Sequence, residues 1–415
     1  MSEVFDPEEE KILEILDLDE LVIYFQPIVF VAGKKIVGLE ALARGKKDGE
    51  LVSPLSLFAR AEAFNLRHEL DRLCRKIAFR EFKKVYEDHP NMVLFFNFDG
   101  SVLDTVGCPT GYIYRLVKHY HLPPQNVVIE ITENRVRHLE NLKQFIEYYK
   151  NLGFLIALDD VGIEYSNLHR IPELKPHILK IDRLLISGID KEYYKQKVVK
   201  ALTFLAKDIG ALTLAEGIEK EEELLRTMEI GITLHQGFYF SKPKPLENIY
   251  VDEVRQYFDL LIFKFYHKMA CYIHQRKQLV ETYRTVIDEL IKILSQKKTK
   301  EFENTLKEWV DKIPEAECFY IVDMNGIMVT NTIFKEGVKV SVSPLFEPAG
   351  LGKSLFCKEY IYPLVSGIFK IYVTEPYVSL ATGNMVITIS KVFENIEGLE
   401  FILCADFSPA HLKEF

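Results

Sequence analysis

Acidic, amide and lysine side chains follow seven apolar, strand-like runs within the first 245 residues. Each run delivers one polar residue at its carboxyl end, except one that delivers two. They are Glu40, Asn97, Glu130, Asp159, Asp160, Lys180, Glu216 and Gln236. Because the loops at the carboxyl ends of barrel strands converge on one mouth, we expect these side chains to meet there. Converging carboxylates and amides are suited to holding divalent metal against a phosphodiester.

The acidity of this set predicts a metal site. A single carboxylate at a strand end is usually a helix cap or a surface residue, but several buried together must be protonated or paired with cations. Asp159 and Asp160 are adjacent, so one of them could bridge two ions. No HExxH or CxxC spacing is present. Oxygen ligands are therefore expected, and they favour magnesium, manganese or calcium.

Lys180 would place a positive charge beside the metals. It could orient the attacking water or stabilise the charge that develops as bonds change. The structural alternative is a salt bridge to Asp182 or to a neighbouring carboxylate. Metals in such a mouth lower the pKa of bound water and clamp the attacking and leaving oxygens. These residues therefore predict phosphodiester hydrolysis.

The elements that must position this set alternate between strand-like runs and helical patterns, after an amphipathic helix that ends near Asp19. Eight runs in about 245 residues favour a closed barrel over an open sheet. The runs are Leu21–Val29, Ile36–Ala43, Met92–Asn97, Val127–Ile131, Phe154–Leu158, His177–Ile181, Ala211–Ala215 and Gly231–Phe240. The first two are too close for a crossover helix, and Ala32-Gly33 between them predicts a hairpin. We expect a modified TIM (β/α)8 barrel with an antiparallel first strand.

From Val251 the pattern becomes helical, with apolar residues at near-heptad spacing from Tyr257 to Ile293. This stripe fits a helix that pairs with a second copy, and it also fits a long helix packed on its own domains. A shorter helix over Phe302–Ile313 stops at Pro314. Strand-like runs then predict an α+β domain with an antiparallel sheet. They are Cys318–Val322, Ile327–Thr332, Ile368–Val373, Met385–Ser390 and Glu400–Ala405, with turns at Asn325-Gly326 and Thr382-Gly383-Asn384.

Composition narrows the class of protein. The 415 residues carry a formal net charge of −9, which argues against a nucleic-acid coat. The 48% of hydrophobic residues include no run long enough to span a membrane, and the start lacks a secretory signal, so a cytoplasmic protein is expected. The six scattered cysteines suggest buried thiols, with no disulfide framework.

Taken together, the motifs resemble those of EAL-domain cyclic-di-GMP phosphodiesterases in order and spacing over residues 20–245. The matching segments are YFQPI at 24–28, EALAR at 40–44, EITE at 130–133, LDD at 158–160, KID at 180–182, AEGIE at 215–219 and QGFYF at 236–240. The resemblance implies hydrolysis of cyclic di-GMP to linear pGpG with two magnesium or manganese ions, and inhibition by calcium. No GGDEF cyclase motif is present, so synthesis is not expected.

The resemblance also implies roles for single residues. Glu40, Asn97, Glu130 and Asp159 would hold one metal. Asp159 and Asp160, with Glu216, would hold the other, although Glu216 is alternatively the general base. Lys180 and Gln236 would lie near the nucleophilic water, and Glu133 would hold the loop after Asp160. The expected substrate-binding residues are Gln26, Leu42, Arg44, Pro54, Asp182 and Glu219, with Arg44 meeting a phosphate oxygen.

One segment departs from the family pattern. After Asp159-Asp160, active members usually read Phe-Gly-Thr/Ala-Gly-Tyr-Ser-Ser, whereas this chain has VGIEYSN at residues 161–167. Glu164 replaces a glycine, and Ile163 replaces a small or hydroxylated residue. Two hypotheses follow: a metal-dependent phosphodiesterase, which the intact ligand set favours, and a catalytically weak cyclic-di-GMP receptor. A barrel for another phosphodiester such as RNA is disfavoured by the acidic charge.

The carboxyl-terminal region resembles PAS-like sensor domains of the Cache type over about residues 315–408. The resemblance is carried by YIVDMNG at 320–326, EPYVS at 375–379 and VITIS at 386–390, with Asp406 where the last strand closes. We therefore expect an EAL-type barrel over residues 1–250, a helical linker over 251–313 and a sensor-like domain over 314–415. The implied partners are a second copy of the chain, in a homodimer, and an unknown small ligand for the last domain. The implied role of that domain is regulation of the barrel.

Overall fold

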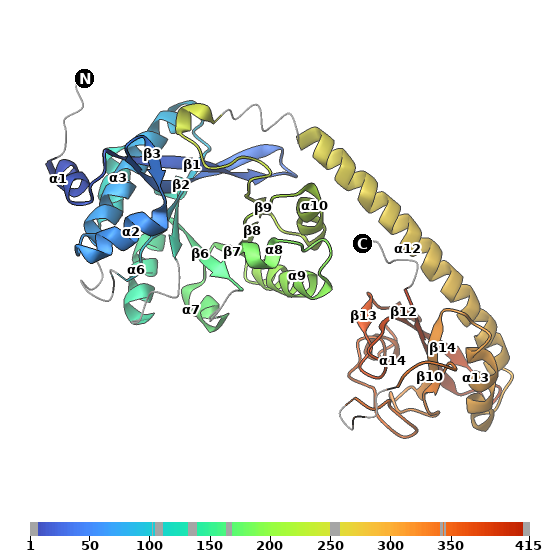
Figure 1. Cartoon of the computed structure of the whole chain (residues 1–415). Coiled ribbons are helices and arrows are strands. Elements are labelled where there is room, and N and C mark those ends of the chain that lie inside the picture. The colour runs from blue at the N-terminus through green and yellow to red at the C-terminus, as the bar shows by residue number, and fades with distance from the viewer. Residues whose placement is uncertain are drawn as a thin grey trace. The chain divides into compact units, whose positions relative to one another are not determined.

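The computed structural model describes residues 7–101, 103, 111–131, 139–162, 168–249, 258–340, 343 and 346–409. The chain forms two compact units, Met1–His267 and Lys268–Phe415, and each is described by itself (Figure 1). Among the helices of the described ranges, none has the length and apolar character needed to cross a membrane.

The first unit is built on a sheet that closes on itself. Eight strands form the ring in the order β1-β9-β8-β7-β6-β5-β4-β2, and β2 pairs back onto β1. They are β1 (Glu20–Phe30), β2 (Lys35–Lys47), β4 (Val93–Phe98), β5 (Val127–Ile131), β6 (Leu155–Val161), β7 (Ile178–Ile181), β8 (Leu212–Ala215) and β9 (Leu234–His235). β1 is antiparallel to β2 and β9, and the other neighbours in the ring are parallel. The predicted modified barrel with an antiparallel first strand is confirmed.

Two strands differ from the expected runs. β3 (Glu50–Val52) was not predicted and adds an antiparallel edge to β2. β9 has two residues, whereas the sequence predicted a strand as far as Phe240. The prediction was wrong there because the backbone after β9 hydrogen-bonds to a neighbouring loop: Ile218 N donates to Gln236 O at 3.0 Å, and Tyr239 N donates to Ile218 O at 3.0 Å.

Helices cover the outside of the barrel, where a large apolar core lies between strands and helices (Figure 1). They are α1 (Pro7–Ile15), α2 (Pro54–Ala63), α3 (Arg67–Asp88), α5 (Tyr112–His119), α6 (Leu139–Asn151), α7 (Ile171–Leu174), α8 (Arg183–Ile186), α9 (Tyr193–Asp208) and α10 (Glu221–Ile230). A second, smaller core fills the barrel interior. This division into an outer and an inner core is the expected one for a closed α/β barrel.

The long helix α12 runs from Phe258 to Leu294 and confirms the helical pattern after residue 257. Phe258 and Leu261 are buried in the core of the first unit. Leu279 and Tyr283 begin a buried stripe that belongs to the core of the second unit. Tyr257, the first position of the predicted stripe, lies outside the described residues.

The second unit has an antiparallel sheet in the order β11-β10-β15-β14-β12, with β13 paired to β14. Its strands are β10 (Ala316–Asp323), β11 (Ile333–Phe334), β12 (Ile371–Val373), β13 (Tyr377–Val378), β14 (Met385–Glu394) and β15 (Glu400–Phe407). The end of α12 and helix α13 (Phe302–Val310) pack on one face of this sheet, and α14 (Tyr362–Val365) contributes to the other. The expected α+β class is present.

The expected strand Ile327–Thr332 was wrong. The turn before it is as predicted, because Asp323 N bonds Ile327 O at 2.8 Å and Gly326 has a φ of +75°. The chain stays beside β10, with a bridge between Val322 and Met328 and with Val329 N donating to Ile321 O at 2.9 Å, but Met328 N also donates to Lys353 O at 2.9 Å. The pairing of this segment with β10 is therefore limited to isolated contacts, and a regular strand begins only at β11.

Candidate active site

The barrel interior is organised in two layers. The lower layer is apolar and takes one residue from each of seven strands: Ile28, Phe95, Val128, Ala157, Ile178, Leu214 and Leu234. Because side chains of a strand alternate, the residue two positions further along a strand lies on the same face. Two positions above this layer stand Asn97, Glu130, Asp159, Lys180, Glu216 and Gln236, and two positions before Ile28 on the antiparallel strand stands Gln26. The apolar floor therefore fixes which polar residues face the mouth.

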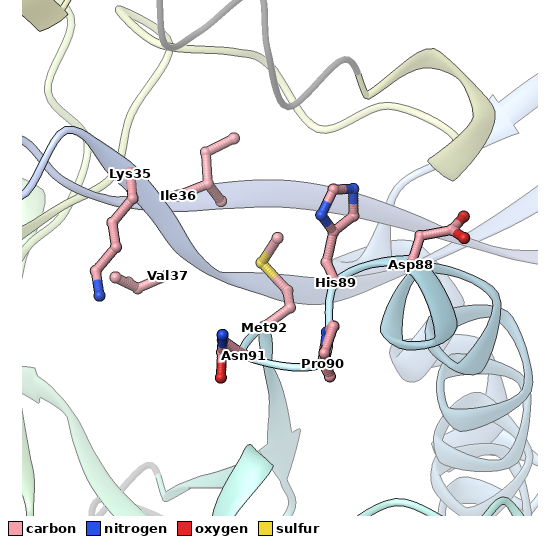
Figure 2. A pocket seen from close by; sticks show the side chains of 8 residues that line it. All are labelled: Lys35, Ile36, Val37, Asp88, His89, Pro90, Asn91 and Met92. Carbon is pink, nitrogen blue, oxygen red and sulfur yellow. The ribbon is translucent and has the colours of Figure 1, made fainter.

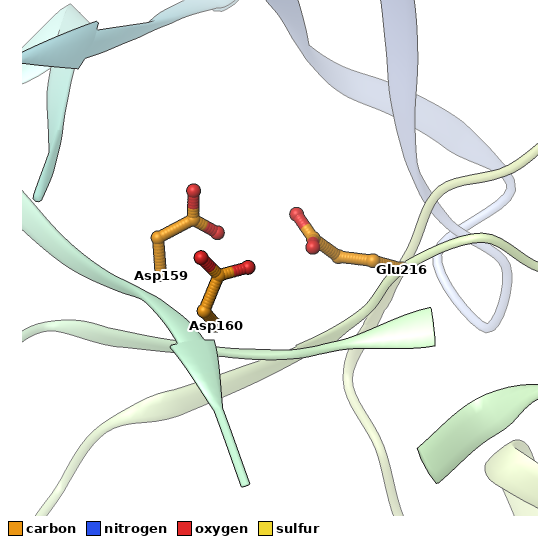
Figure 3. A group of neighbouring side chains, drawn as sticks. All are labelled: Asp159, Asp160 and Glu216. Carbon is orange, nitrogen blue, oxygen red and sulfur yellow. The ribbon is translucent and has the colours of Figure 1, made fainter. Parts of the chain in front are cut away.

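Asp159 and Asp160 need a special backbone, since adjacent residues of a regular strand point to opposite faces. The register between β6 and β7 shifts between Leu158 and Val161, and Asp160 has a φ of +56°. This local bulge lets both carboxylates serve the same mouth. One ligand oxygen each from Asp159, Asp160 and Glu216 lies within 4.8 Å of the others, and the three side chains turn toward a common space in Figure 3.

Lys180 lies at the centre of the acidic set. Its Nζ is 2.7 Å from Glu216 Oε1, 2.9 Å from Glu130 Oε1, 3.0 Å from Asp159 Oδ1 and 3.6 Å from Glu40 Oε1. Its side chain is 1% exposed. The structural alternative for Lys180, a salt bridge to a neighbouring carboxylate, is therefore present in this arrangement. The same contacts place its charge where the metal ligands converge.

Amide groups tie Glu40 to two other strands. Asn97 Nδ2 donates to Glu40 Oε1 at 3.2 Å, and Gln236 Nε2 donates to Glu40 Oε2. Gln236 Nε2 also reaches Gln26 Oε1 at 3.1 Å, while Gln26 Nε2 donates to Ser241 O at 3.0 Å. Glu40, Gln26 and Gln236 are all buried. The amides hold one wall of the mouth in place.

Burial and the shared lysine set the protonation of the carboxylates. Burial raises the pKa of Glu130 well above its usual range and that of Glu216 to about 8, with Lys180 opposing both effects. Burial would also raise the pKa of Glu40, but Lys180 and the amides outweigh it and hold that pKa below its ordinary value. Burial opposes the charge of Lys180, but Asp159, Glu130 and Glu216 prevail and keep its pKa well above the usual one. One cation is shared among more carboxylates than it can neutralise.

Two buried oxygens of this set, Glu130 Oε2 and Gln236 Oε1, accept no hydrogen bond from the described residues. Two others, Glu130 Oε1 and Asp159 Oδ1, meet only the ammonium group of Lys180, at 2.9 Å and 3.0 Å. Buried acceptors without donors are costly unless a cation meets them. Carboxylate and amide oxygens are also the ligands that hard divalent ions prefer. These oxygens, taken as metal ligands, therefore fit a divalent ion such as magnesium or manganese.

The expected substrate-binding residues fall into two groups. Leu42 and Arg44 follow Glu40 on the same face of β2, and both are half-buried. Arg44 Nη1 donates to Ala43 O at 2.7 Å and its guanidinium lies 6.0 Å from the centre of the Tyr24 ring. Pro54 is the first residue of α2, after the cap Ser53. These residues line the end of β2 and the helix that follows it.

Asp182 and Glu219 make contacts of their own. The Asp182 carboxylate accepts from Leu184 N at 2.5 Å and caps α8. Glu219 Oε1 pairs with Arg183 Nη2 at 2.8 Å, and its side chain is exposed. Glu133, Ile163 and Glu164 lie outside the described residues. The structure thus brings the metal ligands, Lys180, Gln236 and Gln26 together, and it engages Asp182 and Glu219 in local bonds.

Sequence reasoning missed how the loops of Glu216 and Gln236 support each other. A Cβ on Gly237 would lie 2.0 Å from Ile218 O, so the two backbones touch at a residue that only glycine can fill. The glycine after Gln236 was the available signal. A pocket of about 330 Å³ lies at the opposite end of the barrel, where Val37 and Met92 precede the polar layer of β2 and β4 (Figure 2). It shares no residue with the mouth.

Comparisons with known proteins agree with this geometry. The chain is 27% identical to the uncharacterised EAL-domain protein YkuI of Bacillus subtilis over 97% of this chain and 98% of that protein. The crystal structure of YkuI with cyclic di-GMP and calcium matches at a TM-score of 0.79 and 25% identity, over 98% of this chain and 99% of that one. The probable cyclic di-GMP phosphodiesterase PdeB of Escherichia coli is 30% identical over 57% of this chain, which spans 45% of PdeB. The EAL domain signature matches residues 9–243, which is more than half of this chain, and the chain therefore belongs to the EAL-domain family.

Proposed function

We propose that the protein is a metal-dependent phosphodiesterase that hydrolyses cyclic di-GMP to linear pGpG. The observation that carries this proposal is the ring of buried carboxylates around Lys180, with carboxylate and amide oxygens that no hydrogen bond satisfies. PdeB carries the name of a probable cyclic di-GMP phosphodiesterase, and YkuI was crystallised with cyclic di-GMP. Such a site fits a charged phosphodiester held against metal.

We propose magnesium or manganese as the metal, with Glu40, Asn97, Glu130 and Asp159 holding one ion and Asp159, Asp160 and Glu216 available for a second. The bulge at Asp160 supports this sharing, because it brings its carboxylate within 4.8 Å of the oxygens of Asp159 and Glu216. Bound ions would lower the pKa of water and clamp the reacting oxygens. Calcium, which accompanies the dinucleotide in the YkuI structure, is proposed as an inhibitor.

The remaining roles belong to side chains of the chain itself. Lys180 orients the attacking water, with Gln236 beside it. Glu216, whose pKa is raised to about 8 by burial, is suited to take a proton near neutral pH if it does not ligate metal. Arg44 binds a phosphate oxygen, while Gln26, Leu42 and Pro54 contact the dinucleotide. Asp182 and Glu219 are proposed as further substrate-binding residues, and Glu133 is proposed to hold the loop after Asp160.

The direct test is incubation of the full chain with cyclic di-GMP and Mn²⁺, followed by chromatographic detection of pGpG. Product is expected from the wild type and is expected to be lost in Glu40→Ala, which removes a metal ligand. Glu50→Ala is the matched control, because Glu50 is an exposed glutamate of the neighbouring strand β3. Undiminished hydrolysis by Glu40→Ala would refute the metal assignment.

A receptor that binds cyclic di-GMP without cutting it is the second candidate. The observation in its favour is the sequence of the loop after Asp160, where Ile163 and Glu164 replace the family's usual residues. Tight dinucleotide binding with no pGpG in the same assay would select the receptor. Glu164→Gly should then raise turnover, and an unchanged rate would show that this position is not what limits the chemistry.

We further propose that the chain forms a homodimer and that the carboxyl-terminal domain is a PAS-like sensor for a small ligand, with residues 1–250, 251–313 and 314–415 as barrel, linker and sensor. Exposed apolar residues on α12, Phe263, Tyr266 and Ile273, support a contact with a second copy. Sedimentation of wild type and of Phe263→Asp tests the dimer. Comparing the hydrolysis rate of the full chain with that of residues 1–250 tests regulation, and equal rates would remove it.

A further inference from the structure

Two loops at the mouth are joined by a hydrogen-bonded carboxylate that the chemistry described so far does not use. One loop follows β8 and carries Glu216, and the other follows β9 and carries Gln236. Their backbones are already in contact through the hydrogen bonds of Ile218 with Gln236 and Tyr239. Side chains add a second connection at the outer end of both loops, centred on Glu221.

Glu221 is the first residue of α10 and receives donors from two directions. Tyr239 OH donates to Glu221 Oε2 at 3.2 Å. Lys264 Nζ, from the second turn of α12, donates to Glu221 Oε1 at 2.9 Å and to Oε2 at 2.8 Å. The carboxylate therefore joins the loop of Gln236 to the loop of Glu216, and it fastens both to the long helix.

The surroundings make this connection stronger than an isolated surface pair. All three side chains are partly buried, and burial with the neighbouring Glu221 raises the pKa of Tyr239 to about 12. Tyr239 also packs at an edge against Phe240, with ring centres 5.3 Å apart. A two-oxygen contact with one lysine restricts the carboxylate more than a single contact would. The group is thus held in one orientation.

We propose that Glu221 is a positioning residue of the active site, and that Lys264 of α12 sets the placement of Glu216 and Gln236 through it. The inference rests on the proposed phosphodiesterase function. Gln236 bonds Glu40, and Glu216 pairs with Lys180, so a movement of either loop is passed to the metal ligands and to the central lysine. Among the proposed dinucleotide-binding residues, Leu42, Arg44 and Pro54 lie outside the two loops. Gln26 lies on β1 but bonds Gln236, so one of the loops contacts it.

This arrangement predicts which kinetic constant changes. Lys264→Met and Glu221→Gln should each lower kcat about two- to fivefold, the range that a partly exposed ion pair supports, with KM within about twofold of wild type. Both should weaken Mn²⁺ binding to the dinucleotide-free protein, measured by calorimetry, by a similar factor. The double variant should be no worse than the stronger single variant, because both changes break one contact. Tyr239→Phe should also lower kcat and leave KM nearly unchanged, with a smaller decrease in kcat.

The chain offers a matched control. Lys34 Nζ pairs with Asp259 Oδ1 at 2.6 Å, so this pair also fastens α12 to the barrel, but at the β1–β2 hairpin and away from the two loops. Lys34→Met should leave kcat and Mn²⁺ affinity at wild-type values. Equal effects of Lys34→Met and Lys264→Met, or additive effects of the Lys264 and Glu221 changes, would overturn the proposal. If the wild type makes no pGpG, the proposed function fails, while the Mn²⁺ affinities still decide the role of Glu221.

Discussion

The two units of this chain each bury carboxylates, and they neutralise them in different ways. At the barrel mouth, Glu40, Glu130, Asp159 and Glu216 share the single cation of Lys180, and oxygens remain without hydrogen bonds. In the second unit, Asp406 of β15 is 6% exposed, and no described residue forms an ion pair with it. Its oxygens accept from Thr388 Oγ1 at 2.7 Å and from Cys318 Sγ at 3.5 Å.

The difference separates a site built for metal from a polar element of a fold. Tyr377 OH lies 2.7 Å from Thr388 Oγ1, so hydroxyl groups form a chain that ends at Asp406. Burial raises the pKa of Asp406 to about 6, and the hydroxyl and the thiol only partly offset that effect. Asp406 can therefore resolve its burial by taking a proton alone. At the mouth the pKa values of Glu130 and Glu216 are also raised, but the central lysine there is already shared among four carboxylates, so protons and added cations compete for the same oxygens.

Removal of Lys180 is expected to have the largest effect on this comparison. Lys180→Met leaves the acidic set without its internal cation, which should lower the free energy of unfolding by about 3–5 kcal/mol in the absence of metal. Turnover should fall by about 10²–10³-fold. Calorimetry and the pGpG assay measure the two losses, and Lys180→Arg, which keeps the charge, should lose less stability. A fully stable Lys180→Met protein would contradict the view that this lysine balances the carboxylates.

Asp406→Asn should have the next largest effect and the opposite sign. The raised pKa means that the stabilising protonated form is fully present below pH 4 and is lost as the pH rises through about 6. At about 1.4 kcal/mol per pH unit over that interval, the ionised carboxyl costs about 3 kcal/mol. Asp406→Asn should therefore be up to that much more stable than wild type at pH 8 and show a flatter pH dependence.

The single tryptophan makes this measurement specific to the second unit. Trp309 lies on α13 and packs against the core of that unit, so its fluorescence during urea unfolding reports on the unit that contains Asp406. Glu308→Gln, at an exposed position of the same helix, is the control and should leave the pH profile unchanged. A steeper profile for Asp406→Asn than for wild type would mean that Asp406 is not the titrating group.

Added manganese should stabilise the first unit and leave the second unit unchanged. At about 100 times its dissociation constant, Mn²⁺ should stabilise the barrel by about 2.7 kcal/mol. The fluorescence of Trp309 should show no corresponding shift for the second unit. Asp160→Asn should reduce the stabilisation of the barrel, since it weakens one of the clustered ligands. If Mn²⁺ stabilised only the unit that Trp309 reports on, the metal would bind the second unit, and the assignment of the metal to the barrel would be wrong.

The smallest expected effect comes from the hydroxyl of Tyr377, the outer group in the series of hydrogen bonds that ends at Asp406. Tyr377→Phe removes the contact with Thr388 and should cost about 1 kcal/mol. It should also raise the pKa of Asp406 slightly, because the donor chain stabilises the ionised form. The midpoint of the pH profile read through Trp309 would then move upward. A downward movement would show that Tyr377 does not support the carboxylate.

Much of the barrel could be predicted because its strands are short apolar runs with polar residues at fixed positions. The alternation that places Val128 in the floor also places Glu130 in the mouth, and that rule needs no tertiary information. The structure differs from the predicted strands where contacts with residues distant in sequence determine where a strand ends. β9 ends early because residues 236–240 bond a loop some twenty residues earlier. The predicted strand at Ile327–Thr332 keeps only isolated contacts with β10, because Met328 also bonds residue 353.

The candidate site was partly accessible from sequence for the same reason. The residues of the polar layer could be named in advance, but their connections could not. That Lys180 contacts four carboxylates at once, or that Glu221 joins Tyr239 to Lys264, depends on the curvature of the closed sheet and on a helix more than forty residues away. Periodicity assigns a side chain to a face, whereas its partners depend on how those faces come together.

The backbone of Asp160 shows what this arrangement costs the folded chain. A residue other than glycine in the left-handed region, here with a φ of +56°, is held there at a cost of the order of 1 kcal/mol. A glycine at position 160 would relax the turn and yet remove a carboxylate from the cluster with Asp159 and Glu216. The most comfortable sequence for folding and the most useful sequence for holding a cation therefore differ at this residue, and engineering for thermostability would select against the site.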